Sequence, residues 1–110
     1  MSTKVMIFST ILALGSVSAL SAQEPVNGAA VYAKTCASCH GPKGTPSPAM
    51  ARTMHLSDFA NADSMAVVAD SVLRRDVAEG KGRGMPAYKT RLTAEQIDSL
   101  VSYIRTLSRH

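Results

Sequence analysis

Cys36-Ala37-Ser38-Cys39-His40 places two cysteines three positions apart, with a histidine directly after the second. This arrangement is the C-x-x-C-H pattern of covalent haem attachment. If the five residues form a turn of helix, both thiols lie along one edge, where each can bond one vinyl group of the same porphyrin. The imidazole, one residue further on, points away from that edge and can reach the iron as an axial ligand. The stretch therefore predicts one covalent haem c, attached through Cys36 and Cys39, with His40 on the iron.

Three other kinds of site use similar residues, and each fits this chain less well. A thioredoxin-like dithiol follows a β-strand, whereas residues 29–34 consist mainly of helix formers. A structural zinc site needs four ligands, and outside the motif the chain offers only His55 and His110 as further histidines and no further cysteine. A disulfide across so short a loop would constrain little of the unfolded chain and would add little stability. We therefore favour haem over all three.

The first 22 residues have the three parts of a secretory signal peptide. Lys4 is followed by an apolar run over residues 5–14 and then by small residues up to Ala22. The apolar run contains Ser and Thr and is shorter than the roughly 20 residues of a membrane-spanning helix. We expect cleavage after Ala22, which leaves a domain of residues 23–110; a cut after Ala19 and an uncleaved N-terminal anchor are the alternatives. Export to the periplasm also suits the haem interpretation, because the thiols must meet haem outside the cytoplasm.

The domain left after cleavage is small, since 110 residues less 22 leave 88. The chain has no Trp, and Phe59 and three tyrosines are the large aromatic side chains of this domain. Domains of this size often need a staple or a cofactor to complete their core. A buried porphyrin would supply a large apolar surface, so we expect the haem-free protein to fold poorly.

Three helices are predicted, separated by segments rich in Gly and Pro. The first runs from about Asn27, a candidate N-cap, to the cysteine motif, and residues 41–48 end it with their glycines and prolines. The second is expected over about residues 62–77 and ends before the glycines of residues 80–84. Its apolar residues recur at helical spacing: Met65, Val68, Val72 and Leu73. No strand pair, repeat or low-complexity tract is recognisable, so the predicted fold class is all-α.

The third helix has the clearest start of the three. Thr93-Ala94-Glu95-Gln96 forms a capping box. The apolar stripe that follows consists of Ile97, Leu100, Val101, Ile104 and Leu107. The polar residues expected on the outer side are Asp98, Ser102, Arg105 and Arg109.

A low-spin haem carrier needs a second iron ligand on the face opposite the histidine. Met85 is our candidate, because it lies in Gly84-Met85-Pro86, where glycine permits unusual backbone angles and proline fixes the exit of the loop. A loop can project a thioether toward iron without the orientation that a helix imposes. Met54 and His55 are the second candidates, since we expect both on a loop. Met65 lies in the stripe of the second helix, where it fills the core.

Together these residues resemble a class I cytochrome c of the small bacterial kind. The resemblance covers nearly all of the region after the signal peptide and rests on Gly28, Tyr32, Cys36-x-x-Cys39-His40-Gly41, Gly84-Met85-Pro86 and Leu100-x-x-Tyr103-Ile104. It implies thioether bonds at Cys36 and Cys39, axial ligands His40 and Met85, and three main helices around one haem. It also implies that the first and last helices cross, with Gly28 letting Tyr103 approach closely.

This family usually places a proline after the motif, and the backbone carbonyl of that proline accepts the ring N–H of the histidine ligand. Such an acceptor fixes the orientation of the ring and raises its basicity. Here Pro42, Pro46 and Pro48 are all available. Pro42 is too close to His40, so Pro46 and Pro48 are the better placed.

With both axial positions filled by protein, the iron has no open site, which suits electron transfer, and Met/His ligation raises the reduction potential. We therefore expect a one-electron carrier between periplasmic or membrane redox partners, and not an enzyme. The acidic residues considered as an acid–base pair are spaced as solvated charges: Asp58, Asp63, Asp70 and Asp76. Two other functions stay open. In the first, the chain is the electron-entry subunit of a membrane oxidase or dehydrogenase. In the second, Met85 does not bind the iron, and the protein is a five-coordinate haem sensor or peroxidase.

The formal net charge is +4, and +3 once Lys4 leaves with the signal peptide. This surplus argues against nucleic-acid binding, which typically needs a dense basic stripe. The cations gather around Met85 and the cysteine motif: Lys81, Arg83, Lys89 and Arg91 in one short segment, with Lys34 and Lys43 beside the cysteines. They predict a positive rim that guides an acidic redox partner to the haem edge. A solvated loop that is basic by chance is the alternative, and membrane contact is expected only through partner complexes or an uncleaved N-terminus.

Overall fold

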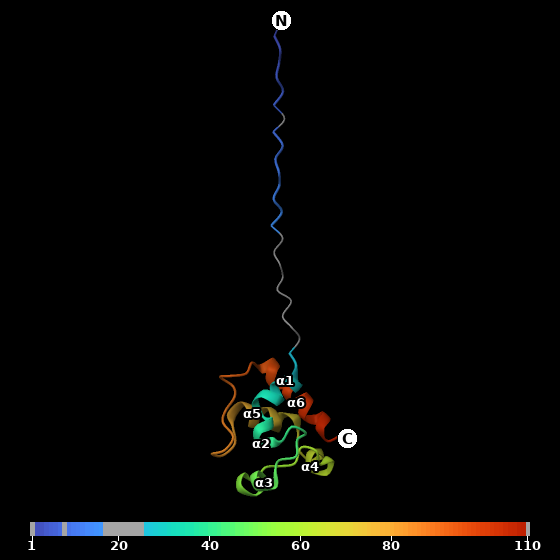
Figure 1. Ribbon diagram of the computed structural model, residues 1–110, viewed down its shortest axis with the longest axis vertical. Coiled ribbons are helices and arrows are strands. Elements are labelled where there is room, and N and C mark those ends of the chain that lie inside the picture. The colour runs from blue at the N-terminus through green and yellow to red at the C-terminus, as the bar shows by residue number, and fades with distance from the viewer. Residues whose placement is uncertain (1, 8, 17–25, 110) are drawn as a thin grey trace.

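The computed structural model describes residues 2–7, 9–16 and 26–109. Residues 26–109 form one helical body, in which α1 (Gly28–Thr35) packs across α6 (Ala94–Leu107) (Figure 1). The other helices are α2 (Ala37–His40), α3 (Pro48–Met54), α4 (Ala62–Ala66) and α5 (Asp70–Glu79). Within the described residues there is no strand, only an isolated bridge between Lys81 and Met85. The predicted all-α fold is confirmed, and α1, α5 and α6 are its three longest helices.

The N-terminal segment differs from the helical body. Its described residues, 2–7 and 9–16, belong to no helix, and their apolar side chains are exposed, among them Ile7, Ile11 and Leu14. No helix in the described part of the chain is long and apolar enough to cross a membrane. Both expected cleavage positions, after Ala19 and after Ala22, lie outside the described residues.

Side-chain caps begin α1 and α6 where the sequence predicts them. Asn27 Oδ1 accepts a hydrogen bond from Ala30 N at 3.2 Å. At α6 the capping box is complete, because Gln96 N donates to Thr93 Oγ1 at 3.1 Å and Thr93 N donates to Gln96 Oε1 at 2.8 Å. These bonds satisfy N–H groups that have no partner within the helix.

The second predicted helix, over residues 62–77, is wrong as a single element, because it is divided into α4 and α5. The cause lies in α6, where Arg105 Nη1 donates to Met65 O at 2.7 Å and Nη2 donates to Val68 O. In a continuous helix these carbonyls would accept the N–H groups four residues further on. Here the guanidinium bonds both of them, and Met65 O also accepts from Val68 N at 3.2 Å. Arg105 also pairs with Asp70 at 2.7 Å. It therefore does not lie on the outer side of α6, contrary to the prediction.

Helix α3 is an element that the sequence pattern does not predict, because the prolines before it indicate a loop. Pro48 occupies its first turn, where a missing N–H removes no helical bond. Ser47 Oγ accepts from Met50 N at 3.3 Å and caps the helix. The helix ends at Met54, and His55 adopts a left-handed conformation with φ 52°. The expectation that both residues lie on a loop is therefore wrong for Met54.

The core lies between α1, α5 and α6, with one contribution from α4. Its buried apolar residues are Tyr32, Met65, Leu73, Val77, Ile97, Leu100, Val101 and Ile104. The predicted stripe of α6 is confirmed, with Leu107 half-buried at its end. Met65 is 2% exposed, which confirms its assignment to the core.

Gly28 brings α1 and α6 together, and the atoms nearest to it belong to Ser99, whereas the resemblance implied Tyr103. A Cβ at Gly28 would lie 2.1 Å from Ser99 O, so the two helix backbones touch at this point. Tyr103 packs instead on Tyr32, with ring centroids 5.3 Å apart and planes tilted by 58°. The crossing of the first and last helices is as predicted, and only the partner of the glycine differs.

Candidate haem site

The cysteine motif forms a helical turn, as predicted, because Cys36 is followed directly by α2. Cys36 caps α2, and its carbonyl accepts hydrogen bonds from Cys39 N at 3.2 Å and His40 N at 3.0 Å. Both thiols are free, with Cys36 half-buried and Cys39 exposed. Burial raises the pKa of the Cys36 thiol to about 11. A redox-active dithiol needs a lowered pKa, so this environment disfavours the thioredoxin-like alternative.

His40 is closely packed at the end of α2. Its ring stacks on Phe59, with centroids 4.6 Å apart and an interplanar angle of 13°. Its Nδ1 is buried and has no hydrogen-bond partner among the described residues. Burial also lowers the pKa of His40, which favours the neutral imidazole that binds metals. A buried nitrogen without a partner is unusual in a folded protein and indicates a functional role.

The loop after the motif folds back onto it. Gly41 has a φ of 83°, and a Cβ there would lie 2.0 Å from Thr45 O, so glycine is required at this position. Tyr32 donates its hydroxyl hydrogen to Gly41 O at 2.6 Å and ties the loop to α1. Phe59, which stacks on the histidine, is fixed by its own N–H, which donates to Gly44 O at 2.9 Å. The surroundings of the imidazole are therefore held by backbone contacts on both sides of the loop.

The three prolines considered as carriers of the histidine acceptor differ in burial. Pro46 is buried, whereas Pro42 and Pro48 are exposed. His40 Nδ1 donates to none of them in this structure. The acceptor therefore stays a prediction, and burial favours Pro46.

The backbone of Met85 is fixed at the base of the loop between α5 and α6. Lys81 N donates to Met85 O at 3.0 Å, and Met85 N donates to Lys81 O at 3.3 Å. Gly80 turns the chain with φ 78°, and a Cβ there would lie 2.7 Å from Met85 O. Tyr88 N donates to Val77 O at 3.0 Å and returns the loop to α5. The Met85 side chain is half-buried and packs against the core.

The two alternative ligands, Met54 and His55, lie at the end of α3 and differ in their contacts. Met54 is 39% exposed, and its terminal methyl carbon lies beside Gly84, the residue before Met85. His55 is exposed. Sequence reasoning placed Met54 as a rival of Met85 but did not predict that the two would be neighbours, because no local pattern links positions so far apart.

The residues of the motif fit a haem better than a metal ion held by the protein alone. Two thiols lie on one turn, and the neutral imidazole beside them has a buried nitrogen without a partner. In the described part of the chain no three His, Cys, Asp or Glu side chains gather to hold a metal ion, which weighs against a zinc site. A haem iron would need fewer ligands from the protein than a zinc ion, because the porphyrin itself supplies four nitrogen ligands.

Three of the four aspartates predicted to be solvated also have partners within the chain, and Asp70 stays exposed. Asp58 accepts from Thr45 Oγ1 and from Ala60 N, both at 2.9 Å. Asp70 pairs with Arg105, and Asp76 lies 3.7 Å from Lys81 Nζ. Asp63 is exposed, as predicted.

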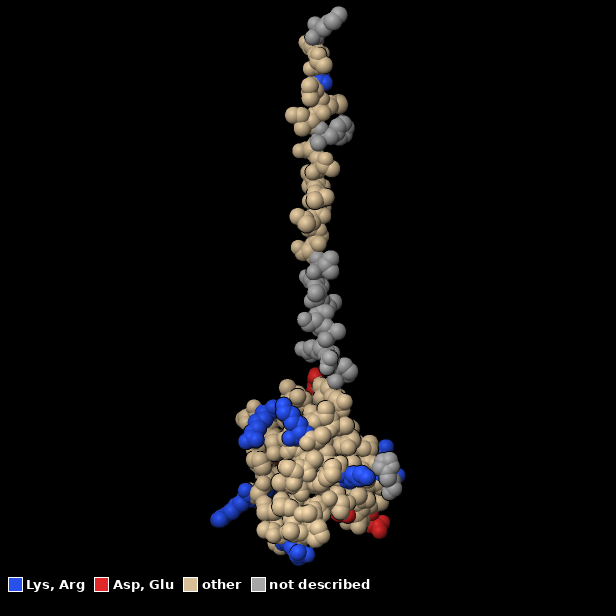
Figure 2. All heavy atoms as spheres, viewed as in Figure 1, with Lys and Arg blue, Asp and Glu red and all other residues tan. Residues whose placement is uncertain are grey.

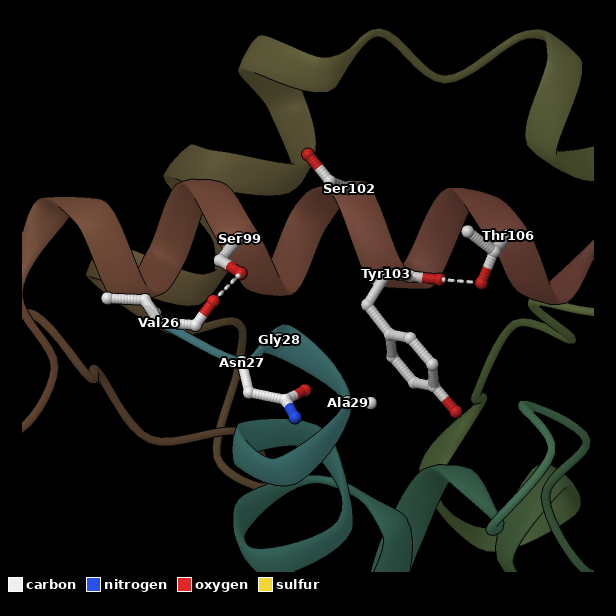
Figure 3. Close-up of a pocket in the computed structure, with 8 residues that line it drawn as sticks. All are labelled: Val26, Asn27, Gly28, Ala29, Ser99, Ser102, Tyr103 and Thr106. Atoms are coloured by element: carbon white, nitrogen blue, oxygen red, sulfur yellow. Dashed lines mark hydrogen bonds between the residues drawn. The ribbon is translucent and has the colours of Figure 1, made fainter. Parts of the chain in front are cut away.

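A shallow hollow of about 440 Å³ lies where α1 crosses α6 (Figure 3). Two of its hydroxyl groups are already engaged, since Ser99 Oγ donates to Val26 O at 3.1 Å and Thr106 Oγ1 donates to Tyr103 O at 2.6 Å. No residue of the cysteine motif lines it. We assign this hollow to the packing of the two helices.

The predicted positive rim contains cations that are paired within the protein. Lys81 Nζ lies 3.7 Å from Asp76, and Lys89 Nζ lies 3.0 Å from Glu79. These acidic neighbours reduce the positive potential that the two lysines present to a partner. Lys and Arg side chains appear on several sides of the visible face, with few acidic side chains between them (Figure 2).

The other cations of the rim have no such partner. Among the described residues no carboxylate lies within ion-pair distance of Lys34, Arg83 or Arg91. The guanidinium of Arg91 lies over the Tyr88 ring, 5.4 Å from its centroid. A second hollow, of about 450 Å³, is lined by Val31, Lys34, Thr35, Tyr88, Arg91, Leu92 and Gln96. Two unpaired cations therefore share one depression next to the motif-bearing end of α1.

Comparison with known proteins gives consistent matches. A family model described as cytochrome C oxidase, cbb3-type, subunit III, matches residues 23–104. A protein named cytochrome c6 from Gloeothece citriformis is 33% identical over an alignment of 107 residues, and the match covers 92% of each chain. A cytochrome c6 from a Nostoc species is 32% identical over 85 residues, covering 76% of this chain and 70% of that one. The solved structure titled KustC0563 c-type cytochrome superposes with a TM-score of 0.69 at 28% identity, covering 74% of this chain and 98% of the other.

Proposed function

Because this chain belongs to the family of the cbb3-type subunit III model and is a small class I monohaem cytochrome c, we propose that four of its residues hold the haem. Cys36 and Cys39 form the thioether bonds, and His40 and Met85 bind the iron from its two faces. The covalent haem c supplies an iron that changes its oxidation state. The protein is an electron carrier. If His40 and Met85 both hold the iron, the chain itself would fill the positions that a substrate could take, which suits electron transfer.

The observation that supports this assignment most strongly is the state of His40. Its imidazole is favoured in the neutral form and has a buried Nδ1 without a partner, next to two free thiols on the same turn. We place the acceptor for Nδ1–H at the carbonyl of Pro46, the buried proline of the loop that folds onto the motif. A proton held at Nδ1 leaves the other ring nitrogen free to bind iron and fixes the ring.

Replacement of Met85 tests the second ligand. In the oxidised haem protein, Met85→Ala should abolish the weak near-infrared Met-to-iron band, lower the reduction potential and let the reduced protein bind CO. Met65→Leu is the matched control, because it replaces a buried core methionine by a leucine of similar volume. It should leave the band in place. An unchanged band and potential in Met85→Ala would refute the assignment. Rapid CO binding by the unmodified protein would favour the five-coordinate sensor or peroxidase.

We place the carrier in the periplasm, with residues 1–22 as a cleaved signal peptide. The charged start, the apolar run over residues 5–14 and the small residues before Ala22 support this. The expected mass of the protein recovered from the periplasmic fraction is that of a chain beginning at Gln23 and carrying one haem. A full-length chain found only with membranes would instead support an uncleaved anchor.

The same fractionation decides between a separate carrier and an electron-entry subunit of a membrane oxidase or dehydrogenase. The description of the matched family favours the subunit. The cytochrome c6 relative matched over 92% of both chains is a protein of this size, which favours the separate carrier. We prefer the carrier, which predicts that the protein leaves the cell in a detergent-free periplasmic extract.

We further propose that its redox partners are acidic where they dock. Lys34 and Arg91 support this, because they line one hollow without an ion-pair partner among the described residues. Exposed positive charge of this kind raises the association rate with an acidic protein, and the effect falls as salt is added. Lys81 and Lys89 contribute less, since each already faces a carboxylate of its own chain.

A further inference from the structure

Met54 and Gly84 are in direct contact, although they belong to different parts of the chain. A Cβ at Gly84 would lie 1.9 Å from Met54 Cε and 3.6 Å from its Sδ. The terminal methyl group of Met54 therefore rests on the α-carbon of Gly84. Gly84 is not among the glycines with positive φ, so an alanine there meets a steric obstacle from Met54 and no backbone strain.

Both sides of this contact are held by backbone structure. Met54 is the last residue of α3, a helix capped by Ser47 at its start. Gly84 directly precedes Met85, whose backbone is bonded in both directions to Lys81. The Met54 side chain therefore links the end of α3 to the base of the loop that carries the proposed thioether ligand.

We propose that Met54 is a positioning residue for Met85. By resting on Gly84, it keeps the loop closed and restrains the Met85 sulfur from leaving the iron. Met54 is 39% exposed and Gly84 is exposed as well, so the contact lies at the surface of the molecule. An unbranched thioether suits such a contact, because it adapts its shape when a haem enters the site. The inference rests on Met85 being the axial ligand.

A double-mutant cycle in the haem-loaded protein tests the contact: Gly84→Ala, Met54→Ala and both together. The readouts are the Met-to-iron band, the reduction potential and the rate of CO binding by the reduced protein. Gly84→Ala places a methyl group where the flexible end of Met54 lies, so Met54 must move off the loop and CO binding should speed up while the band is kept. Met54→Ala should likewise keep the band but speed CO binding and lower the potential. The double variant has no Met54 side chain to displace, so its CO binding and potential should match those of Met54→Ala.

Met54→Leu serves as the conservative control, since it keeps the volume of the side chain and removes the sulfur. It should bind CO as slowly as the unmodified protein. Additive effects in the double variant, or unchanged CO binding in Met54→Ala, would overturn the role of Met54 and leave Met85 as the ligand. Loss of the band in both Met54 variants, with the band intact in Met85→Ala, would show that Met54 itself binds iron and would overturn the proposed coordination. If Gly84→Ala fails to take up haem, the comparison of Met54→Ala with Met54→Leu decides alone.

Discussion

Gly28 at the start of α1 touches the backbone of Ser99 in α6, so that a Cβ on Gly28 would lie 2.1 Å from the Ser99 carbonyl oxygen. The obstacle is backbone, which cannot move aside without separating the two helices. Gly28→Ala should therefore destabilise the haem protein by about 1–3 kcal/mol, the usual cost of overpacking. The measurement is the free energy of unfolding in guanidinium chloride. Ala33→Ser, which also adds one heavy atom but at an exposed position of α1, is the control and should change stability by roughly 0.5 kcal/mol or less.

Arg105 holds the break between α4 and α5 through Met65 O, Val68 O and Asp70. Arg105→Ala leaves two backbone carbonyls without their charged donor, so we expect a loss of roughly 2–3 kcal/mol in unfolding free energy. Arg74→Ala is the comparison, because it removes an exposed ion pair with Asp98 and should cost about 1 kcal/mol or less. Equal costs for the two variants would contradict the role given to Arg105.

Tyr32 makes the stability depend on pH in the alkaline range. Burial, with smaller contributions from Cys36 and Tyr103, raises the pKa of Tyr32 from 10.0 to about 12. The unfolded chain therefore loses this proton at lower pH than the folded one, so the contribution is complete below about pH 10 and is lost as pH rises toward about 12. Tyr32→Phe cannot lose the proton. The unfolding free energy of the unmodified protein should fall more steeply across this range than that of Tyr32→Phe, and parallel curves would contradict the prediction.

Lys34 and Arg91, which have no ion-pair partner among the described residues, should dominate electrostatic docking. Lys34→Gln with Arg91→Gln, and Lys81→Gln with Lys89→Gln, each remove two positive charges. On a carboxylate-terminated electrode at low ionic strength, the first pair should weaken adsorption and slow electron transfer more than the second, because Lys81 and Lys89 already face Asp76 and Glu79. The difference should shrink as salt is added. Equal effects of the two pairs would place the docking charge elsewhere.

The features that the sequence predicts correctly are the local ones. The Asn27 cap, the Thr93–Gln96 capping box and the turn at Cys36–His40 depend on residues within four positions of each other. The stripe of α6 is equally readable, because its apolar residues repeat at helical spacing and all pack on one core. The choice of Met85 also depends on a local signal, since glycine and proline mark its loop in the sequence itself, and its role as a ligand stays a prediction.

The features that escaped prediction depend on contacts between distant residues. The break after α4 is set by Arg105, which lies in another helix. Helix α3 begins at Pro48, and a proline at a first turn looks in sequence like the proline of a loop. The contact of Met54 with Gly84 and that of Gly28 with Ser99 have no local signal either. For the same reason three prolines remained as acceptors for the histidine, and only their burial distinguishes them.

Covalent attachment of haem through Cys36 and Cys39 is tested most directly by acid–acetone extraction of protein purified from a host that can mature c-type haem proteins. Mass spectrometry of the extracted polypeptide then locates the pigment. We expect a coloured chain that keeps its haem after extraction, with the added mass on the peptide that contains residues 36–40. Pigment that passes into the acetone, or a colourless chain from such a host, would contradict it.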